Sequence, residues 1–147
     1  MTMKTEESVV VERPIDSVWR FVSSENLAKA MPGVIDWKKT SVGPYGVGTT
    51  FREMRSKTPK VMDYRVTEFE NFRLGLEITS GPIRGTRITE SVENVEGKTR
   101  LTETAHYNLS GLWKLARPFL DRPGKAEREA MERLNAIKHF LETEAKP

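Results

Sequence analysis

Residues Arg87–Tyr107 read RITESVENVEGKTRLTETAHY, two alternating runs of apolar and polar residues on either side of Glu96-Gly97. Alternating runs separated by two residues that end in glycine are typical of a β-hairpin with a two-residue loop. The loop length fixes the register, because each residue before the loop then has a set partner after it. The expected pairs are Ile88 with Ala105, Glu90 with Glu103, and Val92 with Leu101.

Side chains alternate between the two faces of a strand, so one face of this hairpin is directed into the core. The expected inward residues are Ile88, Glu90, Val92, Leu101, Glu103, Ala105, Tyr107 and Leu109. Two acids, Glu90 and Glu103, then lie side by side on an otherwise apolar face. Opposed like charges are unfavourable on a sheet, and a shared buried site raises the pKa of at least one of the two carboxyl groups.

The acidic pair has two interpretations. With Glu90 and Glu103 as general acid and base and Tyr107 as a hydrogen-bond donor, it suits the cyclisation or dehydration of a carbonyl compound. In the other interpretation, an inward arginine neutralises the acids, or water fills that end of the interior. Glu53 is a third inward candidate, because it alternates in phase with Phe51.

Further short runs rich in Val, Ile, Thr and aromatic residues flank the hairpin, and Gly, Pro or Asn separate them. These runs predict strands at Glu7–Val11, Val34–Val42, Thr49–Ser56, Val61–Phe69, Arg73–Thr79, Arg84–Val95 and Thr99–Leu109. All but the first of these strands follow one another directly along the chain. Such a succession indicates an antiparallel meander.

Helical periodicity occurs near both ends of the chain. After Pro14, one apolar face is formed by Ile15, Val18, Trp19 and Val22. Ser24 resembles the N-cap of a second short helix that ends at Pro32-Gly33. From about Pro123 a long helix is predicted, with Arg133 on its polar side. Its apolar stripe consists of Ala130, Leu134, Ile137 and Leu141.

These elements predict an α+β fold: a seven-stranded curved antiparallel sheet wrapped around a long C-terminal helix, with two short helices between the first and second strands. A length of 147 residues with 37% hydrophobic residues fits one domain, residues 1–147. A strongly twisted sheet that grips one helix cannot pack closely along its whole length. We therefore expect a cavity between sheet and helix, the kind of concave apolar site that binds small molecules.

Strand alternation selects the residues expected to line this cavity. For the strand that begins at Val61, we expect Tyr64 and Val66 to face inward rather than Arg65, because they suit an apolar wall better. Trp113 precedes the long helix in a Gly- and Pro-bounded segment, where it would overhang the cavity opening. The expected ligand-binding residues are Phe51, Glu53, Tyr64, Val66, Leu74, Leu76, Ile88, Leu101, Ala105, Trp113, Leu134 and Ile137.

A glycine-rich stretch at Ser41–Glu53, SVGPYGVGTTFRE, invites comparison with nucleotide-binding loops. A dinucleotide fingerprint needs the order G-x-G-x-x-G between a strand and a helix, so that the pyrophosphate meets the helix N-terminus. Here the order is G-x-x-G-x-G and a strand follows. The stretch therefore predicts a tight corner in the sheet.

Composition narrows the classes of partner. The net charge of +3 comes from interleaved acids and bases, which is typical of a solvated surface and not of a nucleic-acid-binding stripe. The chain has no cysteine, and His106 and His139 show no metal-binding spacing. No apolar run approaches about 18 residues. We expect a cytoplasmic monomer or homodimer without cofactor, metal, nucleic-acid partner or stable membrane insertion.

The chain resembles the polyketide cyclase/dehydrase branch of the START-like, birch-pollen-allergen-type (SRPBCC) helix-grip superfamily. The resemblance lies in VERPIDSVWRFVSSEN, MPGVIDWKKTSVGPYGVGTTFRE, YRVTEFENFRLGLEITSGPIRGT, the EGKTRLTET hairpin and the closing amphipathic helix. It implies a helix-grip fold with a ligand cavity, and it places the glycine-rich corner at the cavity mouth. Because the superfamily includes carriers, receptors and cyclases, the fold alone does not give the function.

Three functions follow as hypotheses. The first is binding of a hydrophobic or amphipathic, lipid- or polyketide-like small molecule in the cavity. The second is a metal-free cyclase or dehydratase that uses the inward carboxyl groups. The third is a protein-interaction module without a ligand.

Overall fold

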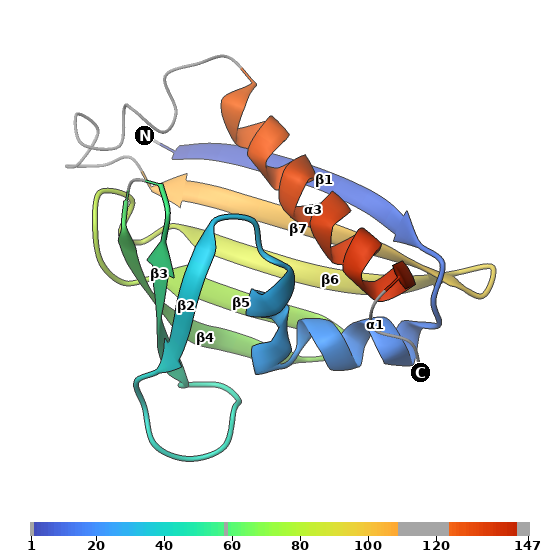
Figure 1. The fold of residues 1–147 in the computed structure, drawn as a ribbon, viewed down its shortest axis with the longest axis horizontal. Helices are drawn as coiled ribbons and strands as arrows, with labels where there is room; N and C mark the ends of the chain where they lie inside the picture. Colours follow the sequence, from blue (N-terminus) through green and yellow to red (C-terminus); the bar gives the residue numbers. More distant parts are fainter. Residues whose placement is uncertain (1, 58, 109–123, 144–147) are drawn as a thin grey trace.

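The computed structural model describes residues 2–57, 59–108 and 124–143. Its elements are β1 (Thr2–Val11), α1 (Ile15–Val22), the 3-10 helix η1 (Glu25–Ala30), β2 (Val34–Lys39), β3 (Thr50–Arg55), β4 (Val61–Glu70), β5 (Arg73–Ile78), β6 (Arg87–Val95), β7 (Lys98–Asn108) and α3 (Lys125–Thr143). The strands form one antiparallel sheet in the order β1-β7-β6-β5-β4-β3-β2. Helix α3 lies across this sheet, and α1 lies beside the C-terminal end of α3 (Figure 1). The predicted fold class is confirmed.

Strands β3, β4, β5 and β7 differ from their predicted bounds by one residue at one or both ends, and β6 begins at Arg87 instead of Arg84. Strand β1 begins at Thr2 instead of Glu7, because antiparallel pairing with β7 continues as far as Asn108. Strand β2 ends at Lys39 instead of Val42, since the chain turns into the glycine corner there. The second short helix is of the 3-10 type, and the Ser24 hydroxyl caps it by accepting a hydrogen bond from the Asn26 N–H.

The β6–β7 hairpin has the predicted register, with Ile88 opposite Ala105, Glu90 opposite Glu103 and Val92 opposite Leu101. Both loop residues adopt left-handed backbone conformations, with φ of 53° at Glu96 and 85° at Gly97. Two such residues in succession form the turn whose twist matches that of paired strands.

A β-bulge in β4 determines which of its side chains face the interior. The β4–β5 loop, Asn71-Phe72, has two residues, so uninterrupted pairing would direct Arg65 inward. The register shifts between Val66 and Glu68, however, where two residues of β4 oppose Gly75 alone. As a result Tyr64 and Val66 are buried, as predicted, and Arg65 forms an exposed ion pair with Glu77.

Gly75 is the residue that makes room for this bulge. A Cβ atom at position 75 would lie 2.9 Å from Glu68 Cβ and 2.9 Å from Thr67 Oγ1. We therefore expect Gly75→Ala to lower the free energy of unfolding by about 1–3 kcal/mol through steric strain. Urea unfolding measures this effect, and Gly97→Ala at an open turn provides a comparison in which only the backbone conformation is strained. Equal stability of Gly75→Ala and wild type would contradict this account of the bulge.

Helix α3 is fixed over the sheet at its C-terminal end. The Glu12 N–H donates to Glu142 Oε2 at 2.7 Å, and Arg13 Nη2 donates to the Glu142 carbonyl at 2.8 Å. The Lys138 ammonium donates to the Val10 carbonyl at 2.7 Å. These contacts set the position of α3 against β1. In the parts of the chain that the structure describes, no helix is both long and apolar enough to cross a membrane.

Candidate functional site

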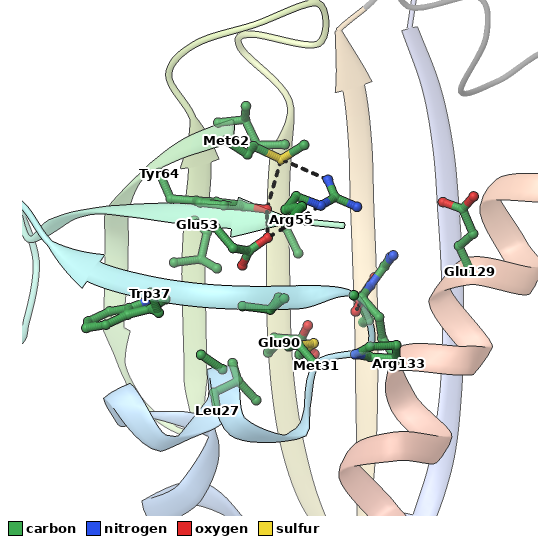
Figure 2. A pocket seen from close by; sticks show the side chains of 18 of the residues that line it. Leu27, Met31, Trp37, Glu53, Arg55, Met62, Tyr64, Glu90, Glu129 and Arg133 are labelled. Atoms are coloured by element: carbon green, nitrogen blue, oxygen red, sulfur yellow. Dashed lines mark hydrogen bonds and ion pairs between the residues drawn. The ribbon is translucent and has the colours of Figure 1, made fainter. Parts of the chain in front are cut away.

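A cavity of about 480 Å³ lies between the inner face of the sheet and the helices η1 and α3. Figure 2 shows part of its lining, with Trp37 and Tyr64 at one side and Arg133 of α3 at the other. Every strand from β2 to β7 contributes to the wall. The wall is therefore built from segments that are far apart in the sequence.

Eight of the predicted site residues line this cavity: Phe51, Glu53, Tyr64, Leu76, Ile88, Glu90, Glu103 and Tyr107. They come from five neighbouring strands, so the sheet brings together the proposed acid/base pair and much of the proposed ligand wall. The pairing of strands into one sheet explains this convergence, because each inward residue lies next to the inward residues of its neighbours.

Six further predicted residues lie in the packed core and not in the cavity wall: Val66, Leu74, Leu101, Ala105, Leu134 and Ile137. These residues lie in the core because helices pack directly on the sheet and leave no cavity there. Helix α1 contacts β6 and β7, and α3 contacts β1 and β7. Alternation identified these residues as inward, but it does not separate a filled interior from a hollow one. Trp113 lies outside the described residues.

An arginine lies beside the acidic pair at the inner end of the cavity and binds one of the two acids. Glu90 and Glu103 are 3% and 1% exposed. Arg133 of α3 donates from Nε to Glu103 Oε2 at 3.2 Å and from Nη2 to Glu103 Oε1. This fork geometry binds both oxygens of one carboxylate. The inward arginine that the sequence left open is thus Arg133, which had been assigned to the polar side of the helix.

Arg133 reaches the acids because its stem is long and the helix lies close to β7. Its side chain is 26% exposed, so the stem is covered by the surrounding protein. Burial alone would lower the pKa of Arg133, but Glu103 outweighs that effect and raises the pKa. The guanidinium therefore stays charged and neutralises one carboxylate.

Glu90 is the acid without such a partner. Among the described residues, nothing donates a hydrogen bond to its buried Oε2. Burial raises the pKa of Glu90 well above the ordinary value, and the adjacent Glu103 raises it further. Glu90 therefore keeps its proton to a higher pH than an ordinary glutamate does, and its surroundings favour the uncharged carboxylic acid. Chemically it is a proton donor next to an arginine-bound carboxylate.

Tyr107 lies next to this cluster and is half-buried. Burial raises its pKa, and the nearby Arg133 opposes part of that rise. The phenol therefore keeps its proton and can donate it in a hydrogen bond.

A second polar group lies at the β3–β4 side of the cavity. The Tyr64 hydroxyl lies 3.3 Å from Glu53 Oε1 and 2.9 Å from Met62 Sδ, and Arg55 Nε lies 3.9 Å from the same Glu53 oxygen. Burial raises the pKa of Glu53, while Arg55 and the Tyr64 hydroxyl oppose part of the rise. Burial, followed by the charge of Glu53, raises the pKa of Tyr64 well above its ordinary value. The cavity thus has two separate places for polar contacts.

Aromatic rings form a row along the same side. The ring centroids of Trp37 and Phe51 lie 5.1 Å apart, and those of Phe51 and Tyr64 lie 4.9 Å apart in a stacked arrangement. The row comes from three adjacent strands, β2, β3 and β4. It provides an apolar surface against which a ligand can pack.

Several lining residues were not predicted. Arg55 and Met62 line the wall beside Tyr64, and Leu27 and Met31 enter from η1 and its end. The N-cap at Ser24 predicts a short helix here, but the sequence does not show that this helix lies over the cavity. The glycine-rich corner also takes part, since Tyr45 lines the cavity, and burial together with Glu25 raises the pKa of Tyr45 to about 12.

Comparison with known proteins agrees with this architecture. The sequence pattern of the family described as "Polyketide cyclase / dehydrase and lipid transport" matches residues 2–138. Norcoclaurine synthase from Thalictrum flavum, solved with dopamine and hydroxybenzaldehyde, aligns with a TM-score of 0.71 at 17% identity, over 99% of this chain and 90% of that chain. A truncated form of that enzyme gives 0.72 at 18% identity, over 99% and 96%. Ara h 8.0201 gives 0.70 at 12% identity, over 96% and 98%.

At these identities the solved structures show a shared fold and nothing more. A comparison with curated proteins finds no match. The family pattern, by contrast, covers nearly the whole chain, including every strand and most of α3. The chain therefore belongs to the polyketide cyclase / dehydrase and lipid transport family.

Proposed function

We propose that the protein binds a hydrophobic or amphipathic small molecule, lipid- or polyketide-like, in the cavity between the sheet and α3. The observation that carries this proposal is the cavity itself, whose volume of about 480 Å³ lies within the range of roughly 300–1,000 Å³ typical of ligand sites. A filled interior would instead have favoured an interaction module without a ligand.

The composition of the wall supports an amphipathic ligand. The aromatic row of Trp37, Phe51 and Tyr64 offers apolar surface, while Glu90 lies in the wall with an oxygen that has no partner among the described residues. A ligand with an apolar body and one polar end satisfies both features. Apolar contact supplies affinity in such sites, and a few placed polar groups set the orientation.

Binding is better supported than acid/base catalysis by the pair. General acid/base work needs one carboxyl group free to take up a proton and another free to give one up. Glu103 is held through both oxygens by Arg133, which leaves Glu90 as the one available acid of the pair. The catalytic roles of Glu90, Glu103 and Tyr107 stay a prediction.

Filling the cavity tests the binding proposal. Ile88 lies in the wall on β6, and Ile88→Phe adds volume where the ligand would lie. We expect this variant to bind a fluorescent apolar dye at least about tenfold more weakly than wild type, since overpacking of about 1–3 kcal/mol corresponds to that factor. Native mass spectrometry should also show loss of any small molecule that copurifies with wild type.

The matched control is Thr89→Phe. Thr89 is the next residue of β6 and is directed away from the cavity, so the added ring lies on the outer face. It should bind the dye as wild type does. If neither wild type nor Thr89→Phe binds dye and both are empty by native mass spectrometry, the proposed function is wrong.

A further inference from the structure

Glu90 differs from Glu53, Glu103 and Glu129 of the cavity wall in that no cation among the described residues lies within ion-pair distance of it. Arg133 binds Glu103, Arg55 lies near Glu53, and Lys125 lies 3.8 Å from Glu129. Glu90 is 3% exposed, lines the cavity, and has an oxygen without a hydrogen-bond partner among the described residues. Figure 2 shows Glu90 among the side chains that line the cavity. A ligand group that reaches this end of the cavity therefore meets a carboxyl group whose nearby cation, Arg133, is already hydrogen-bonded to Glu103.

The lining as a whole is acidic, although the protein is basic. Of the described residues that line the cavity, six are acids and four are bases, whereas the whole chain carries a net charge of +3. The acids that lie deepest, Glu90 and Glu103, are almost fully buried, where charge interactions are screened least. An anionic headgroup at Glu90 would lie beside the Glu103 carboxylate, which already occupies the guanidinium of Arg133.

We propose that the ligand of the cavity carries an amine, which binds as an ammonium ion against the Glu90 carboxylate. This inference rests on the proposed ligand-binding function and names the class of ligand: an apolar molecule with one basic nitrogen. The apolar body packs along the aromatic row at Trp37, Phe51 and Tyr64, and the nitrogen donates hydrogen bonds to Glu90. Hydrogen bonds between two charged groups are stronger than those between two neutral groups, and a primary ammonium carries three N–H donors.

Proton balance follows from the state of the empty site. Before binding, burial and Glu103 from β7 favour the uncharged form of Glu90, while Arg133 from α3 opposes part of that effect. Tyr107 of β7 acts on the same Arg133. When the ammonium binds, the Glu90 proton leaves for solvent and the resulting carboxylate pairs with the ligand cation. One proton is released for each amine bound, so affinity for the amine rises with pH.

Three probes with the same chain and different headgroups test this inference: decylamine, decanol and decanoate. By isothermal titration calorimetry near neutral pH, decylamine should bind wild type at least about tenfold more tightly than decanoate, with decanol between them. Titration in two buffers of different ionisation enthalpy should show proton release with decylamine only. Decylamine affinity should increase from about pH 6 to about pH 8, and decanol affinity should stay constant.

Glu90→Gln should abolish the preference for decylamine over decanol and the proton release on decylamine binding, because glutamine keeps the shape but cannot form the carboxylate. Glu93→Gln is the matched control, since Glu93 lies on the same strand but is exposed and paired with Arg100. Equal or tighter binding of decanoate than of decylamine overturns the amine inference but not the binding function. If none of the three probes binds, both proposals are wrong.

Discussion

Glu103→Gln is expected to lower the free energy of unfolding by about 2–3 kcal/mol, although the substitution replaces only one carboxylate oxygen by an NH2 group. The wild-type carboxylate accepts two hydrogen bonds from Arg133, and it is 1% exposed. Removing one partner of a buried ion pair leaves the other charge unpaired, which typically destabilises a protein by about 3–5 kcal/mol. Because the Arg133 side chain is 26% exposed, water offsets part of that loss. Urea unfolding at neutral pH provides the measurement.

Glu93→Gln serves again as the control, since its ion pair with Arg100 is exposed on the outer face. Exposed pairs contribute about 0–1 kcal/mol, so this variant should stay close to wild type. A loss in Glu103→Gln no greater than that in Glu93→Gln would show that Arg133 does not depend on Glu103.

Glu90→Gln is expected to have the opposite effect, and the effect should grow with pH. The folded protein raises the pKa of Glu90 through burial and through Glu103, so folded Glu90 keeps a proton that the unfolded chain loses above about pH 4.3. Wild type therefore loses stability as pH rises toward the raised pKa, because the folded state binds more protons than the unfolded state. Glutamine has no proton to lose. The stability advantage of the variant should widen by up to about 1.4 kcal/mol for each pH unit in that window.

Urea unfolding of both proteins from about pH 4.5 to about pH 8 measures this gap. Taking the difference between the two proteins removes the contributions of acids that do not interact with Glu90, such as Asp63, whose pKa is lowered by the hydrogen bond from Arg52. A gap that stays constant across this range would mean that Glu90 ionises normally in the folded protein.

Much of the fold was predictable because local signals agree with the final structure. A two-residue loop at Glu96-Gly97 fixes the pairing of β6 with β7, so the side-by-side placement of Glu90 and Glu103 followed from counting residues. The inward direction of Tyr64 was predicted from its suitability for an apolar wall. In the structure Tyr64 faces inward because of a bulge opposite Gly75, which no local pattern of residues predicts.

The candidate site was less predictable, since its chemistry depends on contacts between distant segments. Arg133 lies next to Leu134 on a helix, and helical periodicity alone assigns it to solvent. Only the position of α3 over β7 directs its guanidinium to Glu103. Likewise, alternation cannot separate Leu101, which is packed in the core, from Ile88, which lines a cavity. The interior is filled where helices pack on the sheet and hollow where they do not. Tertiary packing sets the positions of the helices.

Crystals of the protein soaked with decylamine would test the central claim most directly. The account predicts electron density for the probe inside the cavity, with its chain along Trp37, Phe51 and Tyr64 and its nitrogen within hydrogen-bond distance of Glu90. A cavity closed by its own side chains, or one that holds only water while the probe binds elsewhere, would contradict it.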